Sequence, residues 1–139
     1  DWTIRAIRTP GHTSNHMCFG LEENSILFTG DHVMGWSTTV IIPPDGDMTD
    51  YIKSLEKVAA CDYKTFFPTH GAPIKEPKKF VRALIGHRKM REKQILDELE
   101  KTPLCIDEMV RKFYKNTLKC SFEALVGVSH FIVKYPDHV

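Results

Sequence analysis

The sequence predicts an α/β chain in which a small sheet comes first and helices follow. Short apolar runs bounded by turn residues dominate before residue 75, whereas apolar residues at helical spacing dominate after it. The 139 residues are 42% hydrophobic and 27% charged, which is typical of a globular chain with a core and excludes disordered and collagen-like classes. No apolar run in the sequence approaches the roughly 18 residues that a membrane span requires.

Five strands and one helix are predicted in the first part of the chain. The strand patterns lie near residues 2–6, 16–21, 26–29, 40–42 and 65–68. The second and third form a β-hairpin pattern, because only the polar turn 22–25 separates them. Between Thr49 and Ala60 the apolar residues follow helical spacing and charged residues occupy the other face, which predicts an amphipathic helix.

Helices alone are predicted in the second part. A long helical pattern begins near Pro77, which suits a first helical turn, and runs to about Lys101, where Thr102 and Pro103 end it. Two further helices are predicted, at Ile106 to Phe113 and at Ser121 to Val133. The change from strands to helices places a domain boundary near residues 75–85, and we therefore divide the chain into domains 1–80 and 81–139.

The net charge of +1 hides an asymmetry along the chain. Residues 1–74 carry five basic and nine acidic side chains, and residues 75–101 carry nine basic and five acidic ones. A solvated helix face and a contact with a polyanion such as RNA both explain the basic block. The four cysteines, at positions 18, 61, 105 and 120, form no C-x-x-C pair, which favours free thiols and a cytoplasmic location.

Three residues at the ends of predicted strands are candidate metal ligands, namely His12, Asp31 and His70. His12 precedes the first strand of the hairpin and Asp31 follows the second, so both lie at one edge of the sheet. His70 also follows a buried strand. Imidazole and carboxylate groups suit zinc and other first-row divalent cations. A histidine taken alone is more often a surface or core residue than a ligand, so the residues by themselves leave both interpretations open.

The segments around these residues resemble sequence motifs of the metallo-β-lactamase superfamily. Residues 10–16, 28–31 and 68–74 are similar to its third, fourth and fifth motifs, although Thr69 stands where Gly or Ala is frequent. Within the superfamily the chain most resembles the β-lactamase-like protein 2 group, which is related to the glyoxalase II type. Residues 38–40, 43–48, 87–88, 91–96 and 114–117 also resemble that group, so the resemblance covers nearly the whole chain.

The resemblance implies a fold and a metal chemistry. Residues 1–80 would form the C-terminal half of a metallo-β-lactamase αββα sandwich, and residues 81–139 an incomplete winged-helix-like helical module. His12 would bind one Zn²⁺, Asp31 would bridge two Zn²⁺ ions and His70 would bind the second. In a complete enzyme of this kind, a metal-bound hydroxide attacks a phosphodiester, as in RNA, or a thioester or ester bond.

The superfamily signature His-x-His-x-Asp-His does not occur in the sequence. His16, His32, His87, His130 and His138 do not reproduce its spacing, and His16 and His32 are candidates for a supporting or a structural role. The resemblance places the signature in an N-terminal half upstream of Asp1. One histidine and a shared aspartate per ion are fewer ligands than a zinc site normally has. We therefore expect this chain alone to bind metal weakly and to be inactive.

Three interpretations follow from these observations. The first is a fragment of a metal-dependent hydrolase whose partner is the N-terminal half with the signature. The second is a non-catalytic nucleic-acid-binding module that uses the basic segment 75–101 and the helical tail. The third is a dimer in which another chain completes the ligand set. We also expect a homo-oligomer, because the sheet carries apolar residues that the absent half would cover, drawn from Trp2, Ile4, Phe19, Ile26, Phe28, Ile41 and Phe66.

Overall fold

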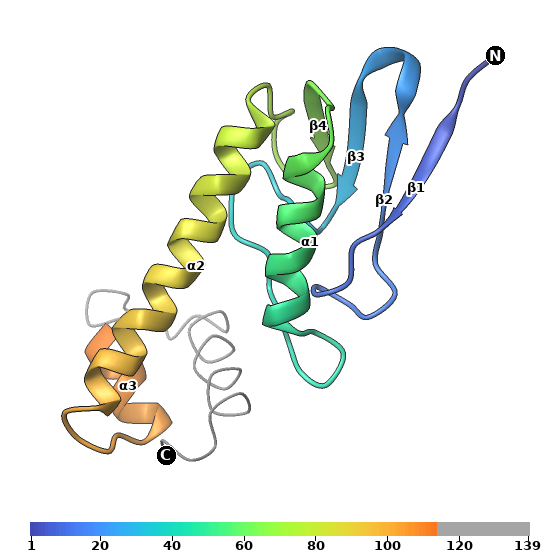
Figure 1. Ribbon diagram of the computed structural model, residues 1–139. Coiled ribbons are helices and arrows are strands. Elements are labelled where there is room, and N and C mark those ends of the chain that lie inside the picture. Colours follow the sequence, from blue (N-terminus) through green and yellow to red (C-terminus); the bar gives the residue numbers. More distant parts are fainter. Residues whose placement is uncertain (114–139) are drawn as a thin grey trace. The chain divides into compact units, whose positions relative to one another are not determined.

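A computed structural model describes residues 1–113 of the chain (Figure 1). The helix predicted at 121–133 and the motif resemblance at 114–117 lie outside the described residues. Within residues 1–113 the α/β class is confirmed, since one four-stranded sheet is accompanied by three α-helices. No helix of this part is both long and apolar enough to cross a membrane. The cytoplasmic location stays a prediction.

The sheet has the strand order β1-β2-β3-β4. Its strands are β1 (Ile4–Arg8), β2 (Met17–Leu21), β3 (Ile26–Gly30) and β4 (Thr65–Pro68). The predicted hairpin is confirmed, because β2 and β3 are antiparallel and joined by the short turn η1 (Glu22–Asn24). β4 instead runs parallel to β3, with Leu27 opposite Phe66. The carboxyl ends of β3 and β4 therefore meet at one edge of the sheet.

The prediction of a strand at residues 40–42 is wrong. The segment between β3 and helix α1 (Met48–Ala60) forms an irregular loop. Ile41 is buried in the core, whereas the carbonyl of Val40 accepts a hydrogen bond from a histidine side chain instead of a strand partner. The N–H of Gly46 closes a turn on the carbonyl of Ile42. The apolar run arises from one buried side chain in a loop, and period-two reasoning cannot separate this case from a short strand.

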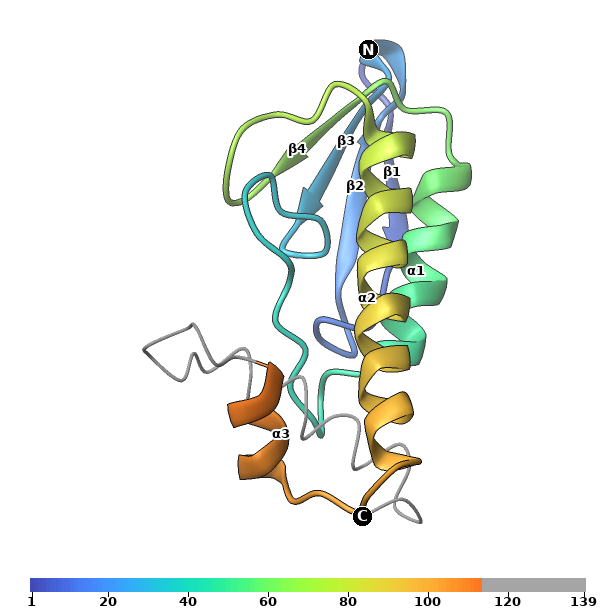
Figure 2. The ribbon, with the colours of Figure 1, turned by 90° about the vertical axis from the view of Figure 1, so that its left-hand side faces the viewer.

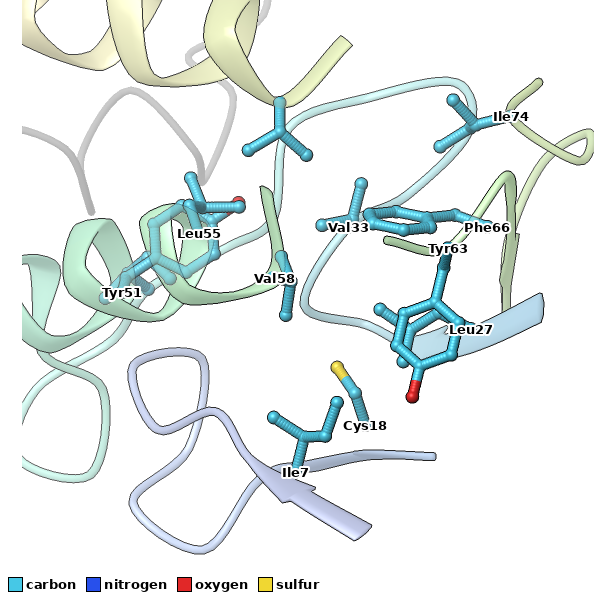
Figure 3. Close-up of a cluster of buried hydrophobic side chains, with 12 residues drawn as sticks. Ile7, Cys18, Leu27, Val33, Tyr51, Leu55, Val58, Tyr63, Phe66 and Ile74 are labelled. Atoms are coloured by element: carbon cyan, nitrogen blue, oxygen red, sulfur yellow. The ribbon is translucent and has the colours of Figure 1, made fainter. Parts of the chain in front are cut away.

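One face of the sheet packs on α1, which confirms the helix predicted from Thr49 to Ala60. Asp47 caps this helix by accepting a hydrogen bond from the N–H of Asp50 at 2.7 Å. Figure 3 shows the resulting core, in which helix side chains meet side chains from all four strands. The core includes Ile7, Cys18, Leu27 and Phe66 from the sheet and Tyr51, Leu55 and Val58 from α1. This packing holds the strand ends in place.

The other face of the sheet is apolar and exposed. Ala6, Phe19, Phe28 and Phe67 lie opposite one another in a row across the four strands. Trp2 and Ile4 extend this surface, and each is about 70% exposed. Phe66 and Ile41, which the sequence also suggested for this face, belong to the core instead. We use the name open face for the apolar surface formed by the exposed Trp2, Ile4, Phe19 and Phe28 together with the half-buried Leu21 and Phe67.

The helices α2 (Pro77–Leu99) and α3 (Ile106–Phe113) agree with their predicted ranges. The chain divides into two compact units, Asp1–Gly86 and His87–Val139. In the first unit, the opening turns of α2 lie on the same side of the sheet as α1 and bury Val81 (Figure 2). In the second unit, the rest of α2 and α3 share a separate small core of Ile95, Leu99, Met109 and Val110. The predicted domains 1–80 and 81–139 stay a prediction.

Candidate metal centre

The three predicted ligands converge on one carboxylate. His12 lies in the loop after β1, Asp31 directly follows β3, and His70 follows β4. His12 Nε2 lies 3.9 Å from Asp31 Oδ2, and His70 Nε2 lies 3.6 Å from Asp31 Oδ1. The structure therefore brings one histidine to each oxygen of the Asp31 carboxylate, at the sheet edge where the sequence predicted the site.

The loop that holds His12 determines which ring nitrogen faces Asp31. His12 Nδ1 lies 2.7 Å from the carbonyl oxygen of Val40. A carbonyl only accepts hydrogen bonds, so Nδ1 carries the proton and donates it. In a neutral imidazole, Nε2 is then the nitrogen with the free lone pair, and it points toward Asp31 Oδ2. Metal-binding histidines in proteins are commonly oriented by a hydrogen bond of this kind.

Asp31 carries an oxygen that lacks a hydrogen bond. Its Oδ1 is buried and has no hydrogen-bond partner among the described residues, and His70 Nε2 at 3.6 Å is too far away to donate one. The main chain around Asp31 is held firmly. Its carbonyl accepts a hydrogen bond from Thr39 Oγ1, and the N–H of His32 donates to the carbonyl of Thr29 at 3.1 Å. The backbone at Asp31 is thus anchored by hydrogen bonds, whereas its carboxylate is incompletely paired.

His70 is placed by a close approach of two loops. The N–H of Gly35 donates to the carbonyl of His70 at 2.8 Å. The next residue, Gly71, has φ +95°, and a Cβ added there would lie 2.7 Å from the carbonyl carbon of Gly35. Only glycine fits such a contact at a positive φ. The His70 ring itself is half exposed, so it stands at the mouth of the site.

Two further histidines lie behind the candidate ligands. The His16 ring lies 6.2 Å from the His12 ring, and the buried His32 ring lies 5.7 Å from that of His16. Burial lowers the pKa of His16, and the nearby His12 lowers it further. Burial, followed by the neighbouring His16, lowers the pKa of His32 to about 3. Both rings are therefore neutral at physiological pH and add no charge next to the candidate ligands.

The geometry fits a divalent cation. Both nitrogen-to-oxygen separations exceed hydrogen-bond length, yet they stay below twice the roughly 2.0–2.2 Å bonds that zinc forms with nitrogen and oxygen. His12 Nε2 is the ring nitrogen that faces the Asp31 carboxylate, and a cation between them would contact both groups. Within residues 1–113 no group of three or more His, Cys, Asp or Glu side chains closes around one ion. The described residues thus provide only part of a ligand set.

Comparison with known proteins identifies the family. Residues 1–70, half of the chain, match the family model described as the metallo-beta-lactamase superfamily. The chain therefore belongs to the metallo-β-lactamase superfamily, a family of hydrolases, and the predicted resemblance to that superfamily is confirmed. The relation to the glyoxalase II type stays a prediction. A metallo-beta-lactamase family protein from Thermus thermophilus superposes with a TM-score of 0.80 over 96% of this chain and 44% of its own, at 20% identity. That likeness confirms the fold, whereas the winged-helix-like module stays a prediction.

Two curated relatives place the chain more closely within the family. The atrochrysone carboxyl ACP thioesterase of Aspergillus fumigatus is 39% identical over 98 residues, which are 70% of this chain and 30% of that protein. The beta-lactamase-like protein 2 homologue of Drosophila melanogaster is 35% identical over 135 residues, which are 94% of this chain and 44% of that protein. The chain thus spans less than half the length of either relative.

Sequence reasoning missed the segment that supports the ligands. Residues 35–40 contact the residues that carry all three candidate ligands, through Gly35, Thr39 and Val40. The sequence suggested a strand for part of this segment. The motif resemblance at residues 38–40 was the signal that pointed to it, and it carried no information about which atoms these residues contact.

Proposed function

We propose that this chain carries the C-terminal part of the metal centre of a metallo-β-lactamase-fold hydrolase. One arrangement supports the proposal above the other observations. Each oxygen of the Asp31 carboxylate has a histidine Nε2 within 4 Å, and the Nδ1 proton of His12 is donated to the carbonyl of Val40. This arrangement suits an aspartate that bridges two ions. In the proposal His12 binds one ion, Asp31 binds both and His70 binds the second.

The metal in this proposal is zinc, with two ions in the complete site. When bound, such ions polarise the scissile bond and lower the pKa of water enough to make it a nucleophile near neutral pH. The chain's own residues hold the negative charge at the sheet edge and keep the His12 lone pair directed inward. The neutral rings of His16 and His32 add no positive charge that would compete with a cation. Iron and manganese are alternative occupants, which a titration with each metal distinguishes.

The substrate class that we propose is a thioester or ester, with a phosphodiester as the competing class. The name of the Aspergillus fumigatus relative, a thioesterase at 39% identity, supports the thioester. Two large apolar side chains, Trp36 and Ile42, are exposed on the loop that holds His12 and His70, which suits a substrate with an apolar part. A bis-aryl phosphodiester and an acyl thioester, offered in parallel, separate the two classes.

The remaining ligands are proposed to come from outside this chain. The relatives are more than twice as long, and the described residues supply one histidine and a shared carboxylate per ion. We propose that a complementary half with the His-x-His-x-Asp-His signature packs on the open face and completes the site. The 139-residue chain alone is then expected to bind zinc weakly and to hydrolyse neither substrate.

Titration of the purified chain with Zn²⁺, Fe²⁺ and Mn²⁺, followed by calorimetry, tests the ligand assignment. Asp31→Asn keeps the shape and removes the charge, so it should abolish the weak zinc binding. Asp62→Asn is the matched control, because that carboxylate is almost fully exposed and pairs with Lys78 instead. Equal zinc affinity of Asp31→Asn and the unchanged chain would refute the site. If the chain alone hydrolysed a substrate and Asp31→Asn abolished that turnover, only the expected inactivity of the chain would be refuted.

The second candidate function, a nucleic-acid-binding module, rests on the basic residues of segment 75–101. Several of these are paired within the chain, with Lys78 to Asp62 at 3.2 Å and Lys93 to Asp97 at 3.5 Å. Such pairing reduces the charge that is available to a polyanion. Titration of the chain with single-stranded RNA, repeated at two salt concentrations, decides between the proposals. Tight binding that weakens steeply with salt would favour the second one.

A further inference from the structure

We propose that segment 35–40 is a brace for the candidate metal centre and that the hydroxyl of Thr39 is its positioning group. The inference rests on the proposed function, because it assigns a role toward the same ligands. It adds a residue that lies outside the predicted ligand set and outside the motifs around the three ligands.

The brace makes a hydrogen bond to each residue that carries a candidate ligand. The N–H of Gly35 donates to the carbonyl of His70 at 2.8 Å, and the carbonyl of Val40 accepts from His12 Nδ1 at 2.7 Å. Between these two contacts, Thr39 Oγ1 donates to the carbonyl of Asp31. Six consecutive residues thus connect three ligands that are up to 58 positions apart in the sequence.

Thr39 is the point at which the brace joins the end of β3. Its side chain is buried, and its hydroxyl contacts the carbonyls of both Asp31 and His32, the second at 3.2 Å. The carbonyl of His32 also accepts from Tyr51 at 3.0 Å, whereas the Asp31 carbonyl depends more directly on Thr39. Because Val40 is the next residue, the position of its carbonyl follows from where Thr39 is held.

The hydroxyl therefore acts on His12 through Val40. While the Val40 carbonyl stays in place, it accepts the Nδ1 proton of His12, and Nε2 is the nitrogen that faces Asp31. Without the Thr39 hydroxyl, the Asp31 carbonyl loses a buried donor and the brace is free to shift. His12 then loses the acceptor that selects its tautomer. Removing a group that orients a metal ligand typically lowers metal affinity about 10- to 100-fold.

If Thr39 had a purely structural role, its variants would behave differently. In that case Thr39→Val, which keeps the shape, would change stability without changing the His12 tautomer. The matched control is Thr38→Val, because the neighbouring hydroxyl takes no part in the hydrogen bonds that join the brace to the three ligand-bearing residues. Thr39→Ser keeps the hydroxyl and should therefore keep the His12 tautomer and the zinc affinity of the unchanged chain. Circular dichroism establishes that each variant is folded, and Thr39→Ala replaces Thr39→Val if the valine does not fit.

The decisive measurement is the imidazole ¹⁵N spectrum of the metal-free 139-residue chain at about pH 8, above the ordinary pKa of histidine. We expect His12 in the Nδ1–H tautomer in the unchanged chain, in Thr39→Ser and in Thr38→Val, but a mixture in Thr39→Val. Zinc affinity should fall about 10- to 100-fold in Thr39→Val alone. A single Nδ1–H tautomer in folded Thr39→Val would overturn the proposal. Absence of zinc binding in all four proteins would refute the proposed function, while the tautomer would still decide the role of Thr39.

Discussion

At the scale of single residues, the site depends on glycines that allow main chains to touch. Gly11 precedes His12, has φ +135°, and a Cβ there would lie 2.3 Å from the Cα of Tyr51 in α1. Gly71 follows His70 and makes a similar approach to Gly35. Two candidate ligands are therefore set beside backbone contacts that no other residue type permits. These contacts position the backbone next to both candidate ligands.

Gly11→Ala should destabilise the chain by about 2 kcal/mol or more, because it combines a strained φ with a clash against the backbone of α1. Gly86→Ala is the matched control. Gly86 lies in α2 with nothing within 4 Å of an added Cβ, so alanine should stabilise the helix by about 1 kcal/mol. Urea unfolding followed by circular dichroism measures both changes. Equal stability of the two variants would contradict this account of Gly11.

Cys18 and Cys105 should differ sharply in reactivity. Burial raises the pKa of the Cys18 thiol to about 11, whereas the thiol of Cys105 is on the surface. The thiolate is the reactive form, so at about pH 8 an alkylating reagent should modify Cys105 and leave Cys18 intact. Peptide mass spectrometry of the native chain measures the labelling. Modification of Cys18 at the rate of Cys105 would mean that the core opens readily; the urea-unfolded chain is the positive control.

At the scale of elements, α3 is held to α2 in the second unit by charge as well as by apolar packing. Lys112 and Lys101 both donate to the Glu98 carboxylate, and Arg91 lies 5.4 Å from the centre of the Phe113 ring. The hydrogen bond from Lys112, followed by that from Lys101, lowers the pKa of Glu98 below its usual 4.5. The small apolar cluster of this unit is thus accompanied by an acid-sensitive contact.

Acidification should loosen this contact. A carboxyl group whose pKa is depressed in the folded state contributes its stabilisation above the unfolded pKa, and the contribution is lost as pH falls through the folded pKa. We expect the amide signals of α3 to shift below about pH 4.5 in NMR spectra. Glu108 lies in α3 and its pKa is also lowered, by the N–H of Cys105, so Glu98→Gln should reduce that shift without abolishing it. Glu100→Gln, an exposed neighbour, should leave it unchanged, and identical titrations of all three proteins would disprove the assignment.

At the scale of the whole molecule, the first unit has one covered and one exposed sheet face. The covered face packs on α1, and the open face presents the row of Phe19, Phe28 and Phe67. An open hollow on this face is lined by Trp2, Ile4, Phe19, Gly20, Leu21 and Phe28. Apolar surfaces of this kind on soluble proteins mark interfaces. We propose that two copies of the chain associate through the open face when the complementary half is absent.

Phe28→Asp should convert this dimer to a monomer, because it places a charge in the centre of the apolar row. The side chain is 48% exposed, so the fold should survive the change. Ile42→Asp is the matched control, since Ile42 is similarly exposed but lies on the loop before α1. Sedimentation at micromolar concentration measures the mass. A species of 16.0 kDa for the unchanged chain would refute the association.

The sequence by itself determined the elements and the three candidate ligands. Alternation in β2 and β3, helical spacing in α1 and α2, and the turn residues between them are local properties, and local periodicity reports them directly. The position of Asp31 after a hairpin strand and of His70 after a buried strand was enough to predict that their side chains meet. The irregular loop at residues 40–42 escaped this reasoning because one buried side chain produces the same short apolar run as a strand.

Only the tertiary structure decided how the ligands are held. The parallel pairing of β4 with β3, the brace at residues 35–40 and the contact of Gly35 with Gly71 all join residues that are far apart in the chain. No local pattern encodes them, because a hydrogen bond from Thr39 to the Asp31 carbonyl depends on where an irregular loop returns to the sheet. The identity of the candidate ligands is thus local information, whereas their orientation arises from packing.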